Sequence, residues 1–432
     1  MLDIRTIRKN AARVQEASQQ KGYPVDIGEL LRLDDERRGV MVQVEAMRQQ
    51  RNQIAAQMKD GKPSPALIET SKQIKTELAS QETRLEALEQ ACESLQKRIP
   101  NLPLDDVPVG VNESENVVTR IDGQLPEFGF EAKNHWQIAE ARGWIDKERA
   151  SKVTGSRFAY LKGELVLLQM AIVQYVLNTL GDANILKKIA GDAGLEISTK
   201  PFTPVLPPLM IRTALYDAMD RLEPSDDRYK IEGEELWLQG SAEHVLGSMH
   251  ANEILDEAAL PIRYIGYASS FRKEAGTYGR DMEGIIRMHQ FDKLEMESFS
   301  TQESGKDEHL LFVAIQEYLL QQLGLPYRVL LKCTADIGKP NARGVDIETW
   351  LPGQNQYRET HTADYMTDYQ ARRLKTRVRR ETGDIELIHT NDATAFALGR
   401  IMVAIIENYQ TNSGKVEVPP VLQPYLGGRI IL

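Results

Sequence analysis

Apolar residues recur at alternating steps of three and four along the first hundred positions of the chain. From 30 to 58, seven of the nine positions in this register are apolar, and the register resumes from 67 to 99 before two prolines end it. This average spacing of 3.5 residues is typical of helices that pack lengthwise against each other. Because only a short segment with Gly and Pro separates the two stretches, the pattern predicts a long antiparallel α-helical coiled-coil hairpin.

The pattern alone leaves the role of this hairpin open. Each arm would be about 45 Å long, which suits a spacer or dimerisation coiled coil and equally an arm that grips an extended partner. A short basic helix is predicted before the hairpin, and its charge is compatible with phosphate contacts. Its basic residues are Arg5, Arg8, Lys9, Arg13 and Lys21.

The chain changes character after the hairpin. Residues 101–127 are rich in Pro, Asp and Val without a helical period, which indicates a linker and an entry strand. Further on, strand-like runs such as 328–333 alternate with helical patterns such as 400–409. We therefore predict two domains, a helical arm over 1–105 and an α+β domain over 106–432.

Composition narrows the class of protein. The net charge of −10 excludes a uniformly basic nucleic-acid binder. Two cysteines, Cys92 and Cys333, provide neither a disulfide framework nor a four-cysteine zinc site, which favours a reducing compartment. The first ten residues lack the apolar core of a secretory signal. The longest uncharged run, 165–181, is shorter than the roughly 20 residues of a membrane span and predicts a buried helix. We expect a cytoplasmic protein without a membrane segment.

The stretch from 271 to 295 carries the most chemistry. It reads FRKEAGTYGRDMEGIIRMHQFDKLE, two predicted strands around a loop that is rich in glycine. Arg272 could hold a phosphate in a bidentate fork, and Phe291 could stack on a base. Glu274 could accept a hydrogen bond from an exocyclic amine. The alternative is a surface hairpin with salt bridges, which the complete pattern makes less favoured.

This stretch resembles motif 2 of the class II aminoacyl-tRNA synthetases, and in detail that of the seryl-tRNA synthetases. The similarity extends along essentially the whole chain. Segments 135–146 and 152–169 resemble the start of that family's catalytic domain, 98–103 its hairpin exit, 206–212 motif 1, 350–359 with 368–373 a further family segment, and 397–410 motif 3.

The resemblance implies a class II synthetase domain, with an antiparallel β-sheet flanked by helices, after the coiled-coil arm. It also implies partners. The arm would bind serine tRNA through the shape and backbone of the RNA, and motif 1 would form a homodimer. The small-molecule substrates would be ATP and L-serine, with Mg²⁺ as cofactor.

The resemblance also assigns residues to ATP. Arg272 would bind the α-phosphate and Arg400 the γ-phosphate, and these two are the expected catalytic residues. Glu359 and Thr362 would supply oxygen ligands to Mg²⁺. The full set expected at ATP is Arg272, Lys273, Glu274, Met288, His289, Gln290, Phe291, Glu359, Thr360, His361, Thr362 and Arg400. A surface position is the alternative for His361.

The residues expected at serine include several departures from the family pattern. They are Ser241, Ala242, Glu243, Arg272, Glu295 and Thr394. Segment 392–395 reads Asp-Ala-Thr-Ala where the family usually has Asn-Gly-Ser-Gly, and 360–362 reads Thr-His-Thr in place of a serine pair. These departures concern selection of the amino acid more than use of ATP.

The implied activity is ATP-dependent conversion of L-serine to seryl-adenylate and transfer of the seryl group to the 3′ end of serine tRNA. Selenocysteine tRNA is a further candidate acceptor. Two alternatives stay open. One is a synthetase paralogue that makes an aminoacyl-adenylate for another acceptor, and the other is a degenerate, non-catalytic RNA-binding dimer.

Overall fold

The computed structural model describes residues 1–59, 64–274 and 284–432. By their internal contacts these residues form two compact units, Met1–Leu102 and Pro103–Leu432. Each unit has its own core, and each is described separately below.

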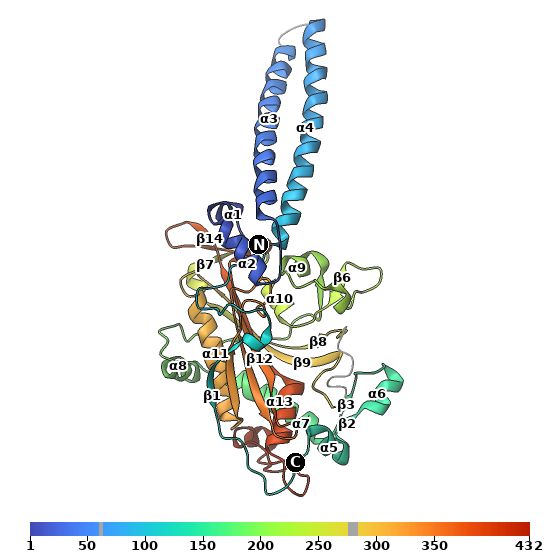
Figure 1. Ribbon diagram of the computed structural model, residues 1–432, viewed down its shortest axis with the longest axis vertical. Helices are drawn as coiled ribbons and strands as arrows, with labels where there is room; N and C mark the ends of the chain where they lie inside the picture. The colour runs from blue at the N-terminus through green and yellow to red at the C-terminus, as the bar shows by residue number, and fades with distance from the viewer. Residues whose placement is uncertain (60–63, 275–283) are drawn as a thin grey trace. The chain divides into compact units, whose positions relative to one another are not determined.

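The first unit is entirely helical. Its elements are α1 (Ile4–Lys9), α2 (Ala11–Gln20), α3 (Ile27–Lys59) and α4 (Pro65–Arg98). Helices α3 and α4 lie side by side as the predicted antiparallel hairpin (Figure 1). Their seam buries Val40, Val44, Leu78 and Leu88, which are four of the positions in the 3.5-residue register. The hairpin prediction is therefore confirmed.

Arg8 and Lys21, which belong to the predicted basic helix, make contacts inside this unit. Arg8 forms ion pairs with Asp34 at 2.7 Å and Asp35 at 2.8 Å. Lys21 is buried and donates a hydrogen bond to the backbone oxygen of Asn101 at 3.2 Å. These two side chains stabilise the base of the hairpin, and Lys21 is too deeply buried to contact a phosphate.

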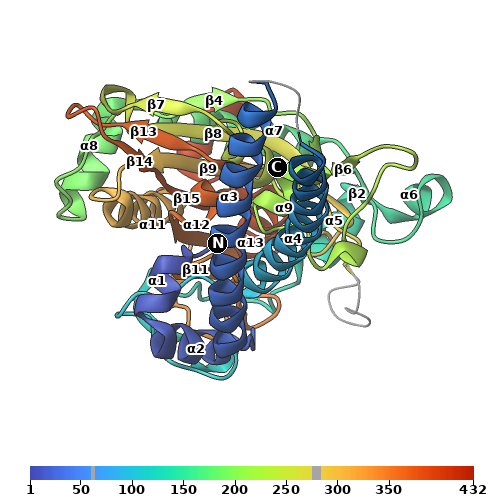
Figure 2. The same cartoon turned by 90° about the horizontal axis from the view of Figure 1, so that it is seen from above.

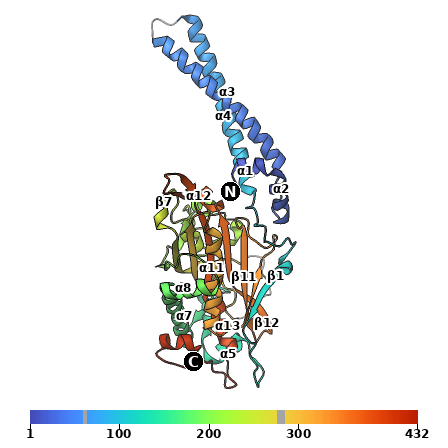
Figure 3. The same cartoon turned by 90° about the vertical axis from the view of Figure 1, so that its left-hand side faces the viewer.

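The second unit is built around an eight-stranded sheet with the order β1-β10-β11-β12-β15-β9-β8-β4. The neighbours pair antiparallel except β4 and β8 (Figures 2 and 3). The strands are β1 (Val117–Asp122), β4 (Thr203–Val205), β8 (Ile262–Phe271), β9 (Gln290–Ser300), β10 (Tyr327–Leu331), β11 (Arg343–Leu351), β12 (Gln356–Thr367) and β15 (His389–Ala397).

Smaller sheets and helices surround it. The short strands are β2 (Ile145–Asp146), β3 (Tyr160–Leu161), β5 (Met210–Arg212), β6 (Leu236–Leu238), β7 (Ile254–Asp256), β13 (Arg377–Arg379) and β14 (Ile385–Leu387). The helices are α5 (His135–Arg142), α6 (Lys147–Val153), α7 (Glu164–Leu180), α8 (Ala183–Asp192), α9 (Thr213–Ala218), α10 (Glu243–Gly247), α11 (Gly305–Gln322), α12 (Tyr369–Leu374) and α13 (Leu398–Asn408). Short 3₁₀ turns are η1 (Glu113–Glu115), η2 (Ser225–Asp227), η3 (Glu257–Ala259) and η4 (Pro420–Leu426).

One large core joins the sheet to helices α7, α8, α11 and α13. The uncharged run predicted as a buried helix is α7, most of whose side chains are buried. An α+β class with an antiparallel sheet flanked by helices is thus confirmed. Among the described residues, no single helix is long and apolar enough to cross a membrane, and only α7 and α8 together, bent by 79°, reach that length and composition.

Strand alternation divides the central sheet into an apolar and a polar face. In β9, Leu294 and Met296 point into the core, so Lys293, Glu295 and Glu297 lie on the opposite face. Strand β15 pairs with β9, β12 pairs with β15, and β11 pairs with β12. Residues that pair across these strands lie on the same face, so the polar face extends from β9 to β11. The cross-strand pairs are Glu295 with Thr394, Glu297 with Asp392, Asp392 with Asp364, and Thr362 with Asp346.

Candidate active site

Strands β8 and β9 form the predicted strand–loop–strand. Their ladder ends at the pair of Phe271 and Gln290, and Arg272 donates its backbone N–H to the oxygen of His289 at 2.9 Å. The Arg272 side chain donates from Nε to the backbone oxygen of Gly240 at 2.9 Å, and its guanidinium lies 5.3 Å from the centre of the Phe291 ring. Most of the predicted Gly-rich loop, residues 275–283, lies outside the described residues.

The start of this loop is fixed by charged side chains. Glu274 has a φ of 51°, a left-handed conformation that is uncommon for a residue with a side chain. Its carboxylate is 3.1 Å from Nη1 of Arg287, and its backbone oxygen accepts a hydrogen bond from Arg157 at 3.1 Å. These contacts hold Glu274 next to Arg272 at the mouth of the site.

A cavity of about 110 Å³ collects side chains from three separate parts of the sequence. The sequence between 272 and 293 supplies one wall, strand β12 a second, and the junction of β15 and α13 a third. The predicted residues that line it are Arg272, Glu274, Met288, Phe291, Glu359, Thr360, Thr362, Thr394 and Arg400.

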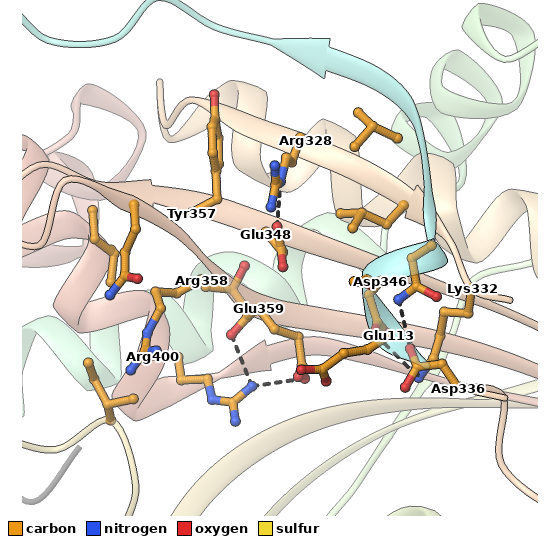
Figure 4. A pocket seen from close by; sticks show the side chains of 18 of the residues that line it. Glu113, Arg328, Lys332, Asp336, Asp346, Glu348, Tyr357, Arg358, Glu359 and Arg400 are labelled. Atoms are coloured by element: carbon orange, nitrogen blue, oxygen red, sulfur yellow. Dashed lines mark hydrogen bonds and ion pairs between the residues drawn. The ribbon is translucent and has the colours of Figure 1, made fainter. Parts of the chain in front are cut away.

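Arg400 and Glu359 form the charged rim of this cavity. Arg400 donates from Nη1 to the backbone oxygen of Glu359 at 2.9 Å and to its Oε1 at 2.8 Å (Figure 4). The charge of Glu359 raises the pKa of Arg400 above its ordinary value. Burial favours a higher pKa for Glu359, but Arg400 and Lys332 outweigh it, so the pKa is lowered and the carboxylate is ionised at neutral pH.

A larger cavity of about 520 Å³ continues from this rim between strands β10, β11 and β12 (Figure 4). Its walls carry both signs of charge. Lys332 lies 3.3 Å from Asp346, and Arg328 pairs with Glu348. Burial raises the pKa of Asp346 to about 7, although Lys332 opposes this. The basic side chains of these walls can bind a polyanion, and the acidic side chains can bind the cation that accompanies it.

A second polar group lies on the neighbouring strands. Glu295 is fully buried, and Ser241 donates its hydroxyl to Glu295 Oε2 at 3.2 Å. Lys293 pairs with the same oxygen and donates to Ser241 Oγ at 3.2 Å. Burial raises the pKa of Glu295 to about 7, and Lys293 only partly offsets it.

Glu243 approaches this group from α10. Its Oε1 lies 2.9 Å from Nε of Arg221 and 3.3 Å from Nε2 of His244. Burial favours a raised pKa, but Arg221 outweighs burial and holds the pKa of Glu243 well below its usual range. Oxygens of Glu243, Glu295 and Asp392 all lie within 4.8 Å of one another, so this cluster can hold a small cation.

The remaining predicted residues lie outside the 110 Å³ cavity. Lys273 is exposed, with its Nζ 5.6 Å from the ring of Tyr229. His289 donates from Nδ1 to the backbone oxygen of Arg272 at 3.0 Å. Gln290 lines an adjoining cavity of about 170 Å³ together with Met288 and Phe291. Ala242 is buried against Leu246 and Ala268.

His361 lies on the apolar side of β12. It is buried, packs edge-on against Phe396 at 5.2 Å, and shares a 2.8 Å hydrogen bond with the hydroxyl of Thr360. Burial lowers its pKa to about 3. His361 is therefore a neutral core residue that does not line the 110 Å³ cavity, and the alternative of a surface histidine is wrong.

Sequence reasoning missed the charged partners beneath the site. Arg221 comes from a loop without a recognisable pattern, and Lys332 from the end of β10. Glu297 could have been found, because Lys293, Glu295 and Glu297 alternate along one strand and must share a face.

Two family models match the chain. Residues 228–409 match the tRNA synthetase class II core domain (G, H, P, S and T), and residues 1–103 match the seryl-tRNA synthetase N-terminal domain. The fold and the site thus define a class II aminoacyl-tRNA synthetase.

Individual relatives narrow this to one family. The serine–tRNA ligase of Symbiobacterium thermophilum is 38% identical over 98% of this chain and 98% of its own length. The serine–tRNA ligase of Deinococcus radiodurans is 39% identical over 100% of this chain and 99% of its own length. The crystal structure of seryl-tRNA synthetase from Pyrococcus horikoshii complexed with ATP has a TM-score of 0.88 at 36% identity and covers 100% of this chain and 99% of that chain. The cytoplasmic serine–tRNA ligase from Naegleria fowleri in complex with AMP gives 0.84 at 27% identity, covering 100% and 98%.

The chain belongs to the seryl-tRNA synthetase family. The predicted family and the predicted enzyme class, a serine–tRNA ligase, are confirmed by these matches along the whole chain.

Proposed function

We propose that the chain activates L-serine with ATP and transfers it to serine tRNA, using the residues gathered at the polar face of the sheet. The observation that carries this proposal is the common cavity of Arg272, Glu359 and Arg400 next to the buried pair of Ser241 and Glu295. A nucleotide and a small amino acid can therefore meet at one place.

The chemistry follows from charge. The serine carboxylate attacks the α-phosphorus of ATP, and pyrophosphate leaves from the opposite side. Arg272 and Arg400 bind the α- and γ-phosphates, which reduces the repulsion between carboxylate and triphosphate and holds the attacking oxygen in line. No general base is required, because the carboxylate is ionised at neutral pH. In the second step, a terminal ribose hydroxyl of the tRNA attacks the adenylate carbonyl and releases AMP.

The residues at the cavity rim fit Mg²⁺. Glu359 offers an ionised carboxylate and Thr362 a hydroxyl in the same cavity, and hard divalent cations prefer such oxygen donors. When bound there, the ion would neutralise phosphate charge. Arg400 would orient Glu359 through their 2.8 Å contact.

The adenine end of ATP fits the pair of Phe291 and Arg272. The guanidinium lies 5.3 Å from the ring centre, so Phe291 keeps Arg272 in place while its outer face can stack on a base. Glu274 and Met288 line the same cavity. Lys273, His289 and Gln290 would act from its edge.

The amino-acid side fits serine. The cluster of Glu243 and Glu295 can receive the substrate ammonium together with Ser241, beside Ala242. Thr394 pairs with Glu295 across the strands and can contact the serine hydroxyl. Alanine would leave these buried polar groups without a partner, which discriminates strongly against it. Threonine would be excluded by size, and the methyl group of Thr394 adds to this restriction.

Recognition of tRNA is assigned to the helical arm, residues 1–105, and catalysis to residues 106–432. The outer half of the hairpin exposes Arg51, Lys59, Lys72 and Lys75, which suit contacts to an RNA backbone. Dimerisation through motif 1 is supported by exposed apolar side chains there, with Leu206 exposed to 81% and Met210 to 46%. A cytoplasmic location completes this proposal.

Pyrophosphate exchange with serine, threonine, alanine and glycine in parallel tests the proposal. We expect Mg²⁺-dependent exchange with serine alone, followed by charging of serine tRNA. Exchange without charging would support a synthetase for another acceptor, and no exchange would support a non-catalytic RNA-binding dimer. The charging assay is repeated with selenocysteine tRNA as the acceptor.

A further inference from the structure

Arg221 joins four segments around the amino-acid pocket. It follows α9, and its Nε lies 2.9 Å from Glu243 Oε1 on α10. Its Nη2 lies 3.3 Å from Asp392 Oδ2 on β15 and 4.0 Å from Asp364 Oδ2 on β12. The same nitrogen donates to Asn341 Oδ1 at 3.4 Å, in the segment before β11. The side chain is only 16% exposed, so solvent screens these contacts weakly.

The surroundings of Arg221 are dominated by negative charge. Glu297 is fully buried, neither of its side-chain oxygens has a hydrogen-bond partner among the described residues, and it pairs with Asp392 across the strands. Burial raises the pKa of Glu297 and of Asp392 well above the ordinary range. The five carboxylates of this region are Glu243, Glu295, Glu297, Asp364 and Asp392, and the cations that interact with them are Arg221, Lys293 and, at Asp364, Lys332.

Without Arg221, Lys332 would still act on Asp364, but Lys293, the other lysine that acts on Glu243, is already bound to Glu295 and Ser241. Glu243 would then lose its closest cation. A buried carboxylate without a partner either takes up a proton or moves toward water. Both changes would remove a negative oxygen from the pocket that is proposed to receive the substrate ammonium.

We propose that Arg221 is a positioning residue for amino-acid selection, which holds Glu243 where the carboxylate meets the ammonium group of the substrate. This inference rests on the proposed function, because it assumes that the amino acid lies at Ser241 and Glu295. Arg221 does not line the cavity assigned to ATP. Its removal should therefore weaken binding of serine and leave binding of ATP nearly unchanged.

The test is pyrophosphate exchange with Arg221→Met and Arg221→Lys. For Arg221→Met we expect the KM for serine to rise by about tenfold or more, as for removal of one partner of a buried ion pair, and the KM for ATP to change less than about twofold. Lysine keeps the charge but reaches fewer of the carboxylates, so an intermediate KM is expected. The matched control is Arg263→Met, since Arg263 is also buried and pairs with Glu308; it should lower the Tm without changing the KM for serine.

A double-mutant cycle with Glu243→Gln separates positioning from a general loss of structure. If Arg221 acts through Glu243, then Arg221→Met should add less than about twofold to the KM for serine of Glu243→Gln. Fully additive effects, an unchanged KM for serine, or equal rises for serine and ATP would overturn the inference. If Arg221→Met does not fold, Arg221→Lys carries the same comparison.

The failure of this inference can be distinguished from failure of the proposed function. A wild-type protein that does not exchange with serine would refute the function. A wild-type protein that exchanges with serine, together with an Arg221 variant of normal KM for serine, would refute only the role of Arg221.

Discussion

Replacement of Arg272 by alanine should nearly abolish formation of the adenylate while leaving the fold intact. Arg272 lies at the end of β8, and its side chain is held by the oxygen of Gly240 through Nε and by the Phe291 ring. Neither contact uses the terminal nitrogens, and Arg272 lines the same cavity as Glu359 and Arg400. The variant removes this fork and the charge that balances the α-phosphate.

The magnitude follows from the hydrogen bonds that are lost. A hydrogen bond to a charged group contributes about 1.5–3 kcal/mol. Two such bonds to the α-phosphate, strengthened as charge develops in the transition state, correspond to about 3–6 kcal/mol and thus to roughly 10²- to 10⁴-fold in kcat/KM. The fold should tolerate the change, because Arg272 is only partly buried and its main-chain hydrogen bond to His289 is retained.

The assay is pyrophosphate exchange with serine, combined with measurement of the Tm and of the oligomeric state. Arg272→Lys keeps the charge without the fork and should give an intermediate rate. Arg149→Ala is the control, because it removes an exposed arginine on α6 that pairs with Asp146 of β2 and should leave exchange unchanged. Near-normal exchange by a folded Arg272→Ala protein would refute the role given to this residue.

Three further predictions concern pH, metal and RNA. Because the pKa of Glu295 is raised from about 4.5 to about 7, ionisation destabilises the substrate-free fold, and stability should fall as the pH rises through this interval. Glu295→Gln should make that fall smaller in a Tm-against-pH series, the rest being due to the other buried carboxylates of raised pKa such as Asp346, and it should raise the KM for serine; an unchanged slope would contradict the assignment. Chelation of divalent cations with EDTA should stop exchange, and Mg²⁺ should restore it; exchange that persists in EDTA would exclude a metal requirement. Lys72→Ala with Lys75→Ala should reduce charging of tRNA about tenfold, with a weaker dependence on salt, and leave exchange unchanged. The pair Lys187→Ala with Lys188→Ala on α8 is the control, and equal losses in both double variants would argue against contact through the hairpin.

The elements that the sequence predicts well are those with a repeating local pattern. The 3.5-residue register from 30 to 58 corresponds to α3, because burial of one helix stripe has to repeat along the helix. The alternation in 271–295 likewise corresponds to the ends of β8 and β9. Both Arg272 and Phe291 belong to this motif, and the structure brings them next to each other.

The features that the sequence does not predict depend on contacts between segments that are far apart along the chain. The sequence predicts a basic helix that includes Lys21, yet Lys21 is buried and bonds to Asn101, eighty positions away. His361 is an ordinary polar residue in the sequence, but the register of β12 turns it into the core against Phe396. The partners of Arg221 lie on α10, β12 and β15, so its contacts can be recognised only in the folded protein. Local pattern carries no information about such partners.

A crystal structure with ATP and Mg²⁺ bound tests the central claim most directly. The account predicts a bent triphosphate with the α-phosphate at Arg272, the γ-phosphate at Arg400 and the metal ion at Glu359 and Thr362, with the adenine against Phe291. A nucleotide bound elsewhere, or bound with Arg272 and Arg400 directed away from its phosphates, would contradict it.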